Sequence, residues 1–329
     1  MLERATKGFK KAFFAITEIE LYKLVIRKSN AIKSIRALLR FRQWPMFHWI
    51  QIETSTYCNR KCHGCPNATF PREKDFISDE TFTKIIDDLV GLKFSGIIHL
   101  HSFNEPLADR TIVEKVCLIS KRLPKARIEM NSNGDFLTLK LLSQLASAGL
   151  GELYVTQYDG KVSDRLLKIL EKAGNREREI LAVRVKSDSD FVGNRAGILN
   201  NVTISEPILG GCNRPFNQMV INYKGDVIIC CNDYFGKEVL GNVENDRLLD
   251  IWSCHRFKTI RRLLRMKRRN CIELCRSCNF MGDIYSYRDL SDSEIRELNM
   301  KVRLKDGNWK ILPKILKGSV DILRAHSWV

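Results

Sequence analysis

The stretch Cys58-Asn59-Arg60-Lys61-Cys62-His63-Gly64-Cys65 places three cysteines within eight residues, with the spacing C-x3-C-x2-C. It follows a run from Trp49 to Glu53 that reads as a strand. Three thiolates on a loop leaving a strand can hold one cubane iron–sulfur cluster, and a four-iron cluster with three protein ligands keeps one iron open. An open iron can chelate a small molecule. From spacing alone, half of a zinc site remains an alternative.

Outward from this loop, short strands alternate with amphipathic helices. The chain has 329 residues, of which 44% are hydrophobic and 28% charged, a composition typical of globular proteins. The alternation predicts an α/β fold with a parallel sheet and covering helices, either open or curled into a barrel. We expect strands at 49–53, 97–101, 127–130, 152–156 and 180–185, and helices at 78–89, 110–122, 137–148 and 163–172.

The pattern changes after about residue 204, where a Gly-Gly pair at 210–211 interrupts it. Beyond this pair, 219–222 and 227–229 are expected to form two strands joined by a hairpin turn at Lys224-Gly225. Residues 248–267 are expected to form one helix. We therefore place a domain boundary near residue 205.

A second set of cysteines lies in this later part of the chain. The chain has eleven cysteines and no evident secretory signal, which favours metal or redox chemistry over disulfides. Cys212, Cys230, Cys275 and Cys278 have the spacing C-x17-C, x44, C-x2-C. Four thiolates from a hairpin and a distant loop make a closed site, for zinc or for a second iron–sulfur cluster.

The first cysteine motif resembles the cluster loop of the radical S-adenosylmethionine (radical SAM) superfamily, which follows the first strand of a partial (β/α) barrel. The resemblance implies that Cys58, Cys62 and Cys65 hold a [4Fe–4S] cluster whose open iron binds S-adenosylmethionine (SAM). In that family the reduced cluster cleaves SAM, and the resulting 5′-deoxyadenosyl radical abstracts a substrate hydrogen. The cofactors carry the hard chemistry, while the protein supplies position and polarity.

Further segments resemble the SAM-binding turns of this family. Asn104-Glu105-Pro106 follows the second expected strand, where the family has a GGE-type motif whose carboxylate accepts from the SAM amino group. Ser132-Asn133-Gly134 resembles the TNG turn near the ribose. Gln157 ends the fourth strand and would face the same cavity. Taken alone, each segment is also compatible with ordinary turn chemistry at a strand end. The resemblance implies a SAM site formed by Asn104, Glu105, Ser132, Asn133, Gln157 and Arg195.

The second cysteine set resembles the SPASM/twitch extension of radical SAM enzymes. The similarity includes Gly225-Asp226-Val227, Leu240-Gly241-Asn242-Val243 and Ile251-Trp252, and the spacing is most similar to that of the 2-deoxy-scyllo-inosamine dehydrogenase type. The twitch form carries one auxiliary [4Fe–4S] cluster on four cysteines. A fully ligated cluster cannot bind substrate, but it can take one electron, so that the net reaction is a two-electron oxidation.

Two residues are candidates for a catalytic role. Arg195, in a segment that resembles the NRAG segment of SPASM proteins, can hold the SAM carboxylate or a substrate oxygen, or can tie the barrel to the extension. Cys231 directly follows Cys230, and a thiol there can donate a hydrogen atom to a substrate radical. Because buried free cysteines are more often structural, we expect Cys231 to pack inward.

The sequence therefore predicts a partial (β/α) TIM-like barrel of radical SAM type with a small C-terminal twitch/SPASM extension and flanking amphipathic helices. The expected divisions are a basic amphipathic N-terminal helical arm, the radical SAM core, the auxiliary-cluster domain and a basic amphipathic tail, at 1–47, 48–204, 205–285 and 286–329.

The net charge of +17 is concentrated in residues 1–43, 255–269 and 301–329. Basic amphipathic helices at both termini either lie on an anionic membrane surface or dock onto the protein itself. The apolar stretches are too short for a membrane span. We expect a cytoplasmic location, with peripheral membrane contact left open. Specific nucleic-acid binding is not expected, because the run 255–269 would largely be the covering helix of the extension.

These features predict a radical SAM oxidoreductase, a dehydrogenase or an epimerase, acting on a carbohydrate-like or other polar small molecule. An electron donor such as flavodoxin or ferredoxin would serve it. One alternative is modification of a ribosomally made peptide. A second is a non-catalytic metal-binding protein at a membrane surface.

Overall fold

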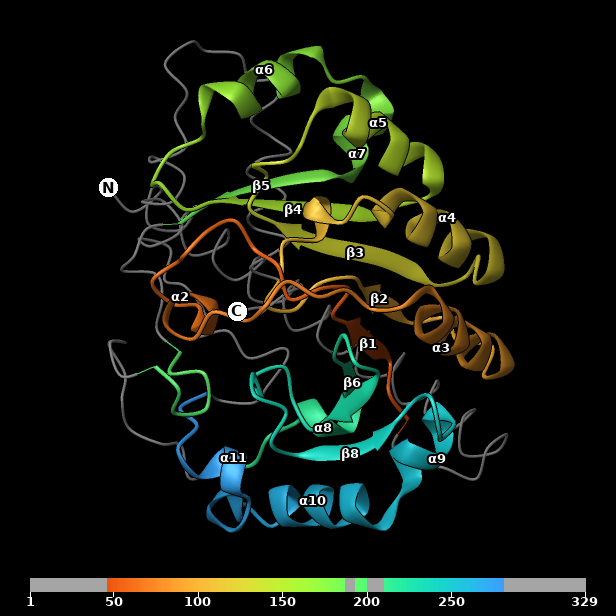
Figure 1. The fold of residues 1–329 in the computed structure, drawn as a ribbon, viewed down its shortest axis with the longest axis vertical. Helices are drawn as coiled ribbons and strands as arrows, with labels where there is room; N and C mark the ends of the chain where they lie inside the picture. The colour runs from red at the N-terminus through yellow and green to blue at the C-terminus, as the bar shows by residue number, and fades with distance from the viewer. Residues whose placement is uncertain (1–45, 187–192, 200–209, 281–329) are drawn as a thin grey trace, which may run out of the picture.

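The computed structural model describes residues 46–186, 193–199 and 210–280. Within these ranges eight strands form one sheet in the order β5-β4-β3-β2-β1-β6-β7-β8 (Figure 1). The strands are β1 Trp49–Ile52, β2 Ile97–His99, β3 Arg127–Ser132, β4 Glu152–Gln157, β5 Leu181–Val185, β6 Gln218–Ile221, β7 Asp226–Ile228 and β8 Val239–Asn242.

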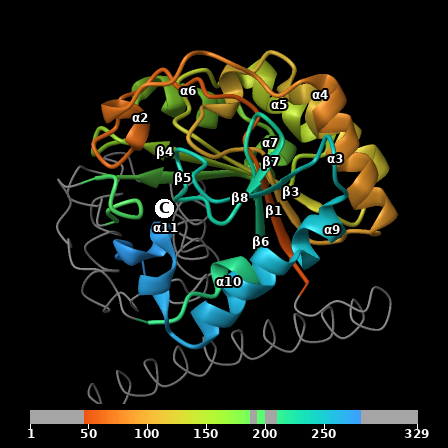
Figure 2. The same cartoon turned by 60° about the horizontal axis from the view of Figure 1, so that its bottom comes forward.

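Strands β1 to β5 are parallel, and the helices between them lie along the outer side of the curved sheet (Figure 2). Apolar side chains of the strands and helices form one buried core between the two layers. This arrangement confirms the predicted α/β fold. The helices are α2 Pro66–Thr69, α3 Asp79–Gly91, α4 Ile112–Arg122, α5 Leu139–Ala148, α6 Asp164–Lys172, α7 Asn175–Ile180, α8 Arg214–Asn217, α9 Leu248–Ser253, α10 His255–Arg265 and α11 Glu273–Arg276.

Side-chain caps begin three of the outer helices. Ser78, Thr138 and Ser163 each accept a hydrogen bond from the backbone N–H three residues later. Such caps satisfy N–H groups that have no partner inside the helix. Helix α7 was not expected, because its short sequence NREREI has no apolar stripe.

Strand β6 pairs in parallel with β1, so the later part of the chain continues the barrel sheet. On the inner face of this pairing, the amide of Gln218 donates to Gln51 Oε1 at 2.8 Å. Strands β6 and β7 form the predicted hairpin. Its turn contains Gly225, which has a positive φ of 80° that suits glycine.

The expectation of one helix over 248–267 is wrong. The chain forms α9 and α10 instead, separated at Cys254, whose backbone is extended and whose sulfur accepts from Phe257 N at 3.4 Å. The break lets Trp252 and Phe257 both turn toward the core, with ring centroids 4.8 Å apart. Helical periodicity continues across the break, so the sequence pattern did not reveal it.

Hydrogen bonds and a contact between aromatic rings hold the extension against the barrel. Thr81 Oγ1 donates to Glu244 Oε1 at 2.7 Å, and Leu248 N donates to Asp88 Oδ2 at 2.8 Å. The Trp252 ring packs edge-on against Phe47, with centroids 5.2 Å apart. The extension therefore shares the barrel core.

The boundary near 205 lies outside the described residues, and so do the expected terminal segments at 1–47 and 286–329, apart from Met46 and Phe47. No helix in the described part of the chain is long and apolar enough to cross a membrane.

Replacing Trp252 with alanine should lower the free energy of unfolding by about 3–5 kcal/mol, because the side chain is fully buried between the barrel and α10. Phe136→Ala is the control, since Phe136 is 38% exposed and should change stability little. Urea denaturation of both variants gives the comparison. Equal midpoints would contradict the shared core.

Candidate active site

The three cysteines of the first motif lie on the loop between β1 and α2. Their side chains line one cavity of about 140 Å³ at the carboxyl ends of the barrel strands. This is the edge at which parallel α/β folds place their ligands. The other lining residues are Gln51, Gly64, His101, Ser102, Phe103, Asn104, Glu105, Asn131, Ser132, Asn133, Tyr158, Arg195, Arg214 and Cys231.

Glu105 is a buried carboxylate in this cavity and is 2% exposed. Its Oε1 accepts from Leu107 N at 3.0 Å and from Ser132 Oγ at 2.6 Å, and its Oε2 accepts from Asn133 N at 2.8 Å. Burial raises the pKa of Glu105 to about 7, although these hydrogen bonds favour the ionised form. Since a carboxylate offers about four lone-pair sites, Glu105 retains capacity for one more donor.

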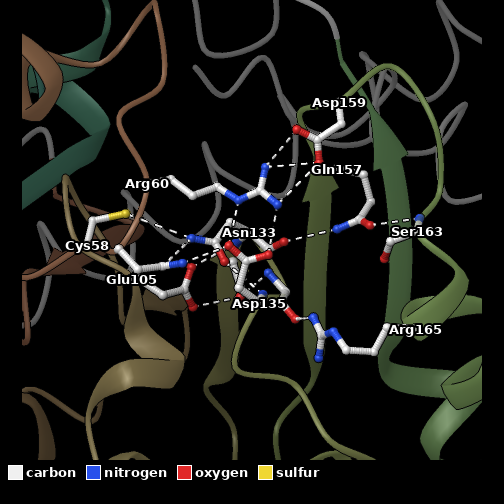
Figure 3. Close-up of polar contacts among 12 residues, drawn as sticks. Cys58, Arg60, Glu105, Asn133, Asp135, Gln157, Asp159, Ser163 and Arg165 are labelled. Atoms are coloured by element: carbon white, nitrogen blue, oxygen red, sulfur yellow. Dashed lines mark hydrogen bonds and ion pairs between the residues drawn. The ribbon is translucent and has the colours of Figure 1, made fainter.

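The Ser132-Asn133-Gly134 turn lies against the cysteine loop (Figure 3). The Asn133 amide lies 3.8 Å from Cys58 Sγ and donates to Asn59 Oδ1 at 2.9 Å. Gly134 has a φ of 77°, and a Cβ there would come within 2.5 Å of Val155 Cγ1. Glycine is therefore required where the turn crosses β4.

Gln157 lies behind this turn and does not line the cavity, contrary to the expectation. Its Nε2 donates to Asn133 O at 3.0 Å, and its Oε1 accepts from Ser163 N at 3.1 Å (Figure 3). Both ends of the amide are thus engaged by backbone. Gln157 fixes the turn from outside the cavity.

Arg60 anchors the cysteine loop to the carboxyl ends of β3 and β4. Its guanidinium donates to both oxygens of Asp135 at 2.6 and 2.8 Å and reaches Asp159 at 3.3 Å (Figure 3). The hydrogen bond from Arg60 lowers the pKa of Asp135 below its ordinary value. A paired guanidinium of this geometry restricts the loop more strongly than a single point charge would.

The backbone of Arg195, Ala196 and Gly197 has three consecutive positive φ angles, of 49°, 58° and 85°. Left-handed backbone costs a non-glycine residue about 1 kcal/mol or more, and such strain is concentrated at functional sites. Here it places Arg195 in the cavity, where Nε donates to Gly64 O at 3.2 Å. Asn194 bonds to the backbone of Ser277 and Asn279. The segment therefore lines the cavity and also ties the barrel to the extension.

The four cysteines of the second set come together around a smaller cavity of about 20 Å³. Ile229, Leu274 and Phe280 contribute apolar surface to it. Burial raises the pKa of Cys212 to about 11. Such a group is a thiol when free and ionises when it binds a metal.

Arg214 lines both cavities and lies between them. It is 2% exposed, its guanidinium donates to Cys231 Sγ, and it lies 4.0 Å from the Phe280 ring centroid. Cys231 lines the first cavity and does not point away from it, so the expected inward packing is wrong. Cys231 and Arg214 form the wall that separates the two sets of ligands.

The structure brings together twelve of the predicted residues at the two cysteine cavities, besides Cys231. The structure adds Arg214, Tyr158, His101 and the inward-facing strand residues Gln51 and Asn131, which were not predicted. Polar residues inside otherwise apolar strands were the available signal, as in Trp49-Ile50-Gln51-Ile52. The predicted residues that line a cavity, besides Arg195, are Cys58, Cys62, Cys65, Asn104, Glu105, Ser132, Asn133, Cys212, Cys230, Cys275 and Cys278.

Comparison with known proteins gives matches over the same two regions. Residues 52–197 match the model of the radical SAM superfamily, and residues 212–279 match that of SPASM, an iron–sulfur cluster-binding domain. S-adenosyl-L-methionine-dependent 2-deoxy-scyllo-inosamine dehydrogenase from Niallia circulans is 31% identical over 235 residues, which cover 71% of this chain and 93% of the relative.

Two crystal structures of BtrN are also similar. The complex with AdoMet and 2-DOIA has 29% identity and a TM-score of 0.66, covering 74% of this chain and 98% of BtrN. The selenomethionine form in an open conformation has 26% identity and a TM-score of 0.56, covering 74% and 95%.

The donor sets fit the groups that these domains bind. Three cysteines line one cavity together with polar groups suited to a SAM molecule, and four cysteines line a separate, smaller cavity. The protein is a SAM-dependent enzyme with a [4Fe–4S] cluster and a SPASM domain for additional iron–sulfur clusters, and the chain belongs to the radical SAM superfamily.

Proposed function

We propose that this enzyme oxidises an alcohol carbon of an aminocyclitol or a related carbohydrate-like ring. The observation that carries the proposal is that the buried Arg214 lines both cavities, which places the four-cysteine site next to the cavity of the first motif. An electron that leaves a substrate in the first cavity has a short path to the second site. The dehydrogenase activity of the Niallia circulans relative supports the same reaction.

In this proposal Cys58, Cys62 and Cys65 hold the SAM-binding cluster, and the four cysteines of the second set hold an auxiliary cluster. When bound, these groups and SAM supply a radical that removes a hydrogen atom and an acceptor for one electron. The auxiliary ligands are Cys212, Cys230, Cys275 and Cys278.

The polar residues of the cavity position SAM and substrate. Glu105 accepts the SAM ammonium at its remaining lone-pair site. Asn104 is fixed in place, since its amide donates to Thr54 Oγ1 at 3.1 Å and its Oδ1 accepts from Ser102 N at 2.8 Å. Ser132 and Asn133 hold the ribose side. The guanidinium of Arg195 holds a carboxylate or hydroxyl oxygen at the opposite wall.

The proposal also includes the domain boundaries and the source of electrons. The radical SAM core spans 48–204 and the auxiliary-cluster domain 205–285, and an electron donor such as flavodoxin or ferredoxin reduces the enzyme. We further propose a cytoplasmic location, with the basic terminal segments making peripheral contact with the membrane surface.

Epimerisation is the second candidate, and the position of Cys231 favours it. An epimerase returns a hydrogen atom to the opposite face of the substrate carbon, and a thiol lining the cavity is a suitable donor. Oxidation needs no such donor. Arg214 donating to the sulfur also suits a structural role for Cys231 in the wall.

The reconstituted protein should contain about eight irons and eight sulfides, because the two cysteine sets each hold one four-iron cluster. Replacing Cys58, Cys62 and Cys65 together with alanine should halve both values and leave the auxiliary signal in electron paramagnetic resonance. A Cys271→Ala variant is the control, since Cys271 is exposed and lies outside both cavities. A wild-type protein that loads one cluster would contradict the assignment.

Glu105→Ala should weaken SAM binding by about tenfold or more, because it removes an acceptor for a charged donor. Its iron content should match that of the wild type, since no metal ligand is changed. Glu80→Ala, on the exposed first turn of α3, is the matched control. Calorimetric titration with SAM provides the affinities, and unaltered binding by Glu105→Ala would remove Glu105 from the SAM site.

Turnover in deuterated water separates the two reactions. Oxidation should leave no new deuterium at a retained carbon, and Cys231→Ala should still form the oxidised product. Epimerisation would place deuterium at the inverted carbon, and that product would disappear in Cys231→Ala while 5′-deoxyadenosine is still formed. Mass spectrometry of the product decides between them.

A further inference from the structure

A second open cavity, of about 320 Å³, lies beside the SAM cavity and plays no part in the chemistry described above. It is lined by Glu53, directly after β1, by residues of β6 and β7, and by the loop after β7. Its lining residues are Glu53, Arg72, Ser102, Phe103, Val220, Ile221, Asn222, Tyr223, Lys224, Asp226, Ile228, Asp233, Tyr234, Phe235 and Gly236.

The two cavities adjoin on the concave face of the sheet. Gln51 lines the SAM cavity, and Glu53 lines the second cavity. The two residues are two positions apart, so their side chains lie on the same face of the sheet. Ser102 and Phe103 line both. The Phe103 ring lies 5.8 Å from the Arg195 guanidinium on one side and packs edge-on against Tyr234, with centroids 5.0 Å apart, on the other. Phe103 is thus a partition between two neighbouring compartments.

The polar groups of the second cavity are held in place before any ligand binds. Arg72 donates to both oxygens of Glu53 at 2.8 and 3.1 Å and lies 4.6 Å from the Tyr234 ring centroid. The carboxylate of Asp233 accepts from the backbone N–H groups of Lys237 and Glu238 at 2.9 and 2.8 Å. Because these side chains are fixed by the protein, little entropy is lost when they bind a ligand.

The lining of this cavity has one more carboxylate than it has cationic side chains. Three carboxylates, on Glu53, Asp226 and Asp233, face two cations, on Arg72 and Lys224. Carboxylates accept from hydroxyl and ammonium groups, whereas the two cations donate to hydroxyl oxygens. The balance suits a neutral or cationic polyol and disfavours a phosphate.

One exposed aromatic side chain, Phe235, lines this cavity, and a second, Phe70, lies next to it. Phe235 is 52% exposed and lies edge-on to Phe70, which is 41% exposed, with ring centroids 5.4 Å apart. Exposed neighbouring aromatics on a soluble protein mark an interaction site, and their faces pack against the C–H faces of a sugar ring. The volume is at the low end of the range of about 300–1,000 Å³ for ligand pockets, so it suits one ring and not a long chain.

We propose that the second cavity binds a second polyhydroxylated ring, linked to the ring that reacts in the SAM cavity. The substrate is then a glycosylated cyclitol or a related two-ring compound that passes over Phe103. This inference rests on the proposed function, because it specifies further the substrate of the same reaction.

The test compares two probes on the reconstituted full-length enzyme with SAM. One is 2-deoxy-scyllo-inosamine, and the other is the same ring carrying a glucosamine on the hydroxyl furthest from the carbon to be oxidised. Calorimetry gives the Kd of each probe, and 5′-deoxyadenosine and oxidised product are measured separately. The two-ring probe should bind at least about tenfold more tightly.

Phe235→Ala and Tyr223→Ala should each reduce this preference by about fivefold, since each removes an aromatic contact of the second ring. Phe136→Ala is the control, because Phe136 is similarly exposed but lines neither cavity, and it should keep the wild-type preference.

Equal affinity for the two probes, or a preference that neither variant changes, would overturn the proposal. So would tighter binding of a phosphorylated cyclitol than of the two-ring probe. Tight, Phe235-dependent binding of the two-ring probe without oxidation would support the second-ring site and contradict the dehydrogenase assignment. Oxidation of the one-ring probe without a preference for the two-ring probe would support the dehydrogenase assignment and contradict the second-ring site.

Discussion

The parallel pairing of β6 with β1 is the constraint on which the active site depends. Four residue pairs, from Trp49 with Gln218 to Ile52 with Ile221, fix the register of the two strands. Because both strands run in the same direction, the cysteine loop after β1 and the hairpin after β6 begin at the same edge of the sheet. A shift of one residue would exchange the inner and outer faces of β6 and move Cys230 and Cys231 away from the cavity.

Burying polar groups at this edge of the sheet costs free energy unless each group has a hydrogen-bond partner, and these hydrogen bonds fix the local structure. Glu105 accepts hydrogen bonds from Ser132 and Asn133, in a turn that is remote from it in sequence, and Gln157 fixes the same turn from behind. Burial alone would lower the pKa of Arg214, but the negative charge that Cys231, Cys230 and Cys212 carry when ionised more than offsets this effect and raises the pKa. A permanent positive charge in a region of low polarity stabilises negative charge on the neighbouring four-cysteine site.

The sequence was most informative where chemistry requires a local pattern. Cys58, Cys62 and Cys65 lie within a single turn-rich loop, and the Ser132-Asn133-Gly134 turn needs glycine at one position, so both could be recognised from adjacent residues. The break at Cys254 and the place of Arg214 depend on contacts with residues far along the chain, which local periodicity does not contain. Gln157 illustrates the same limit, because a position at the end of a strand does not determine which neighbouring groups the side chain will hydrogen-bond.

Asn194 links the segment that lines the SAM cavity to the segment that carries cysteines of the auxiliary site. It accepts from Asn279 N at 3.2 Å and donates to Ser277 O at 2.7 Å, and these two residues flank Cys278. The chain that encloses the auxiliary site thus also fixes the strained turn that carries Arg195. A change that displaces this segment should therefore alter the binding cavity as well as the auxiliary site, so the two sites are not independent targets for mutation.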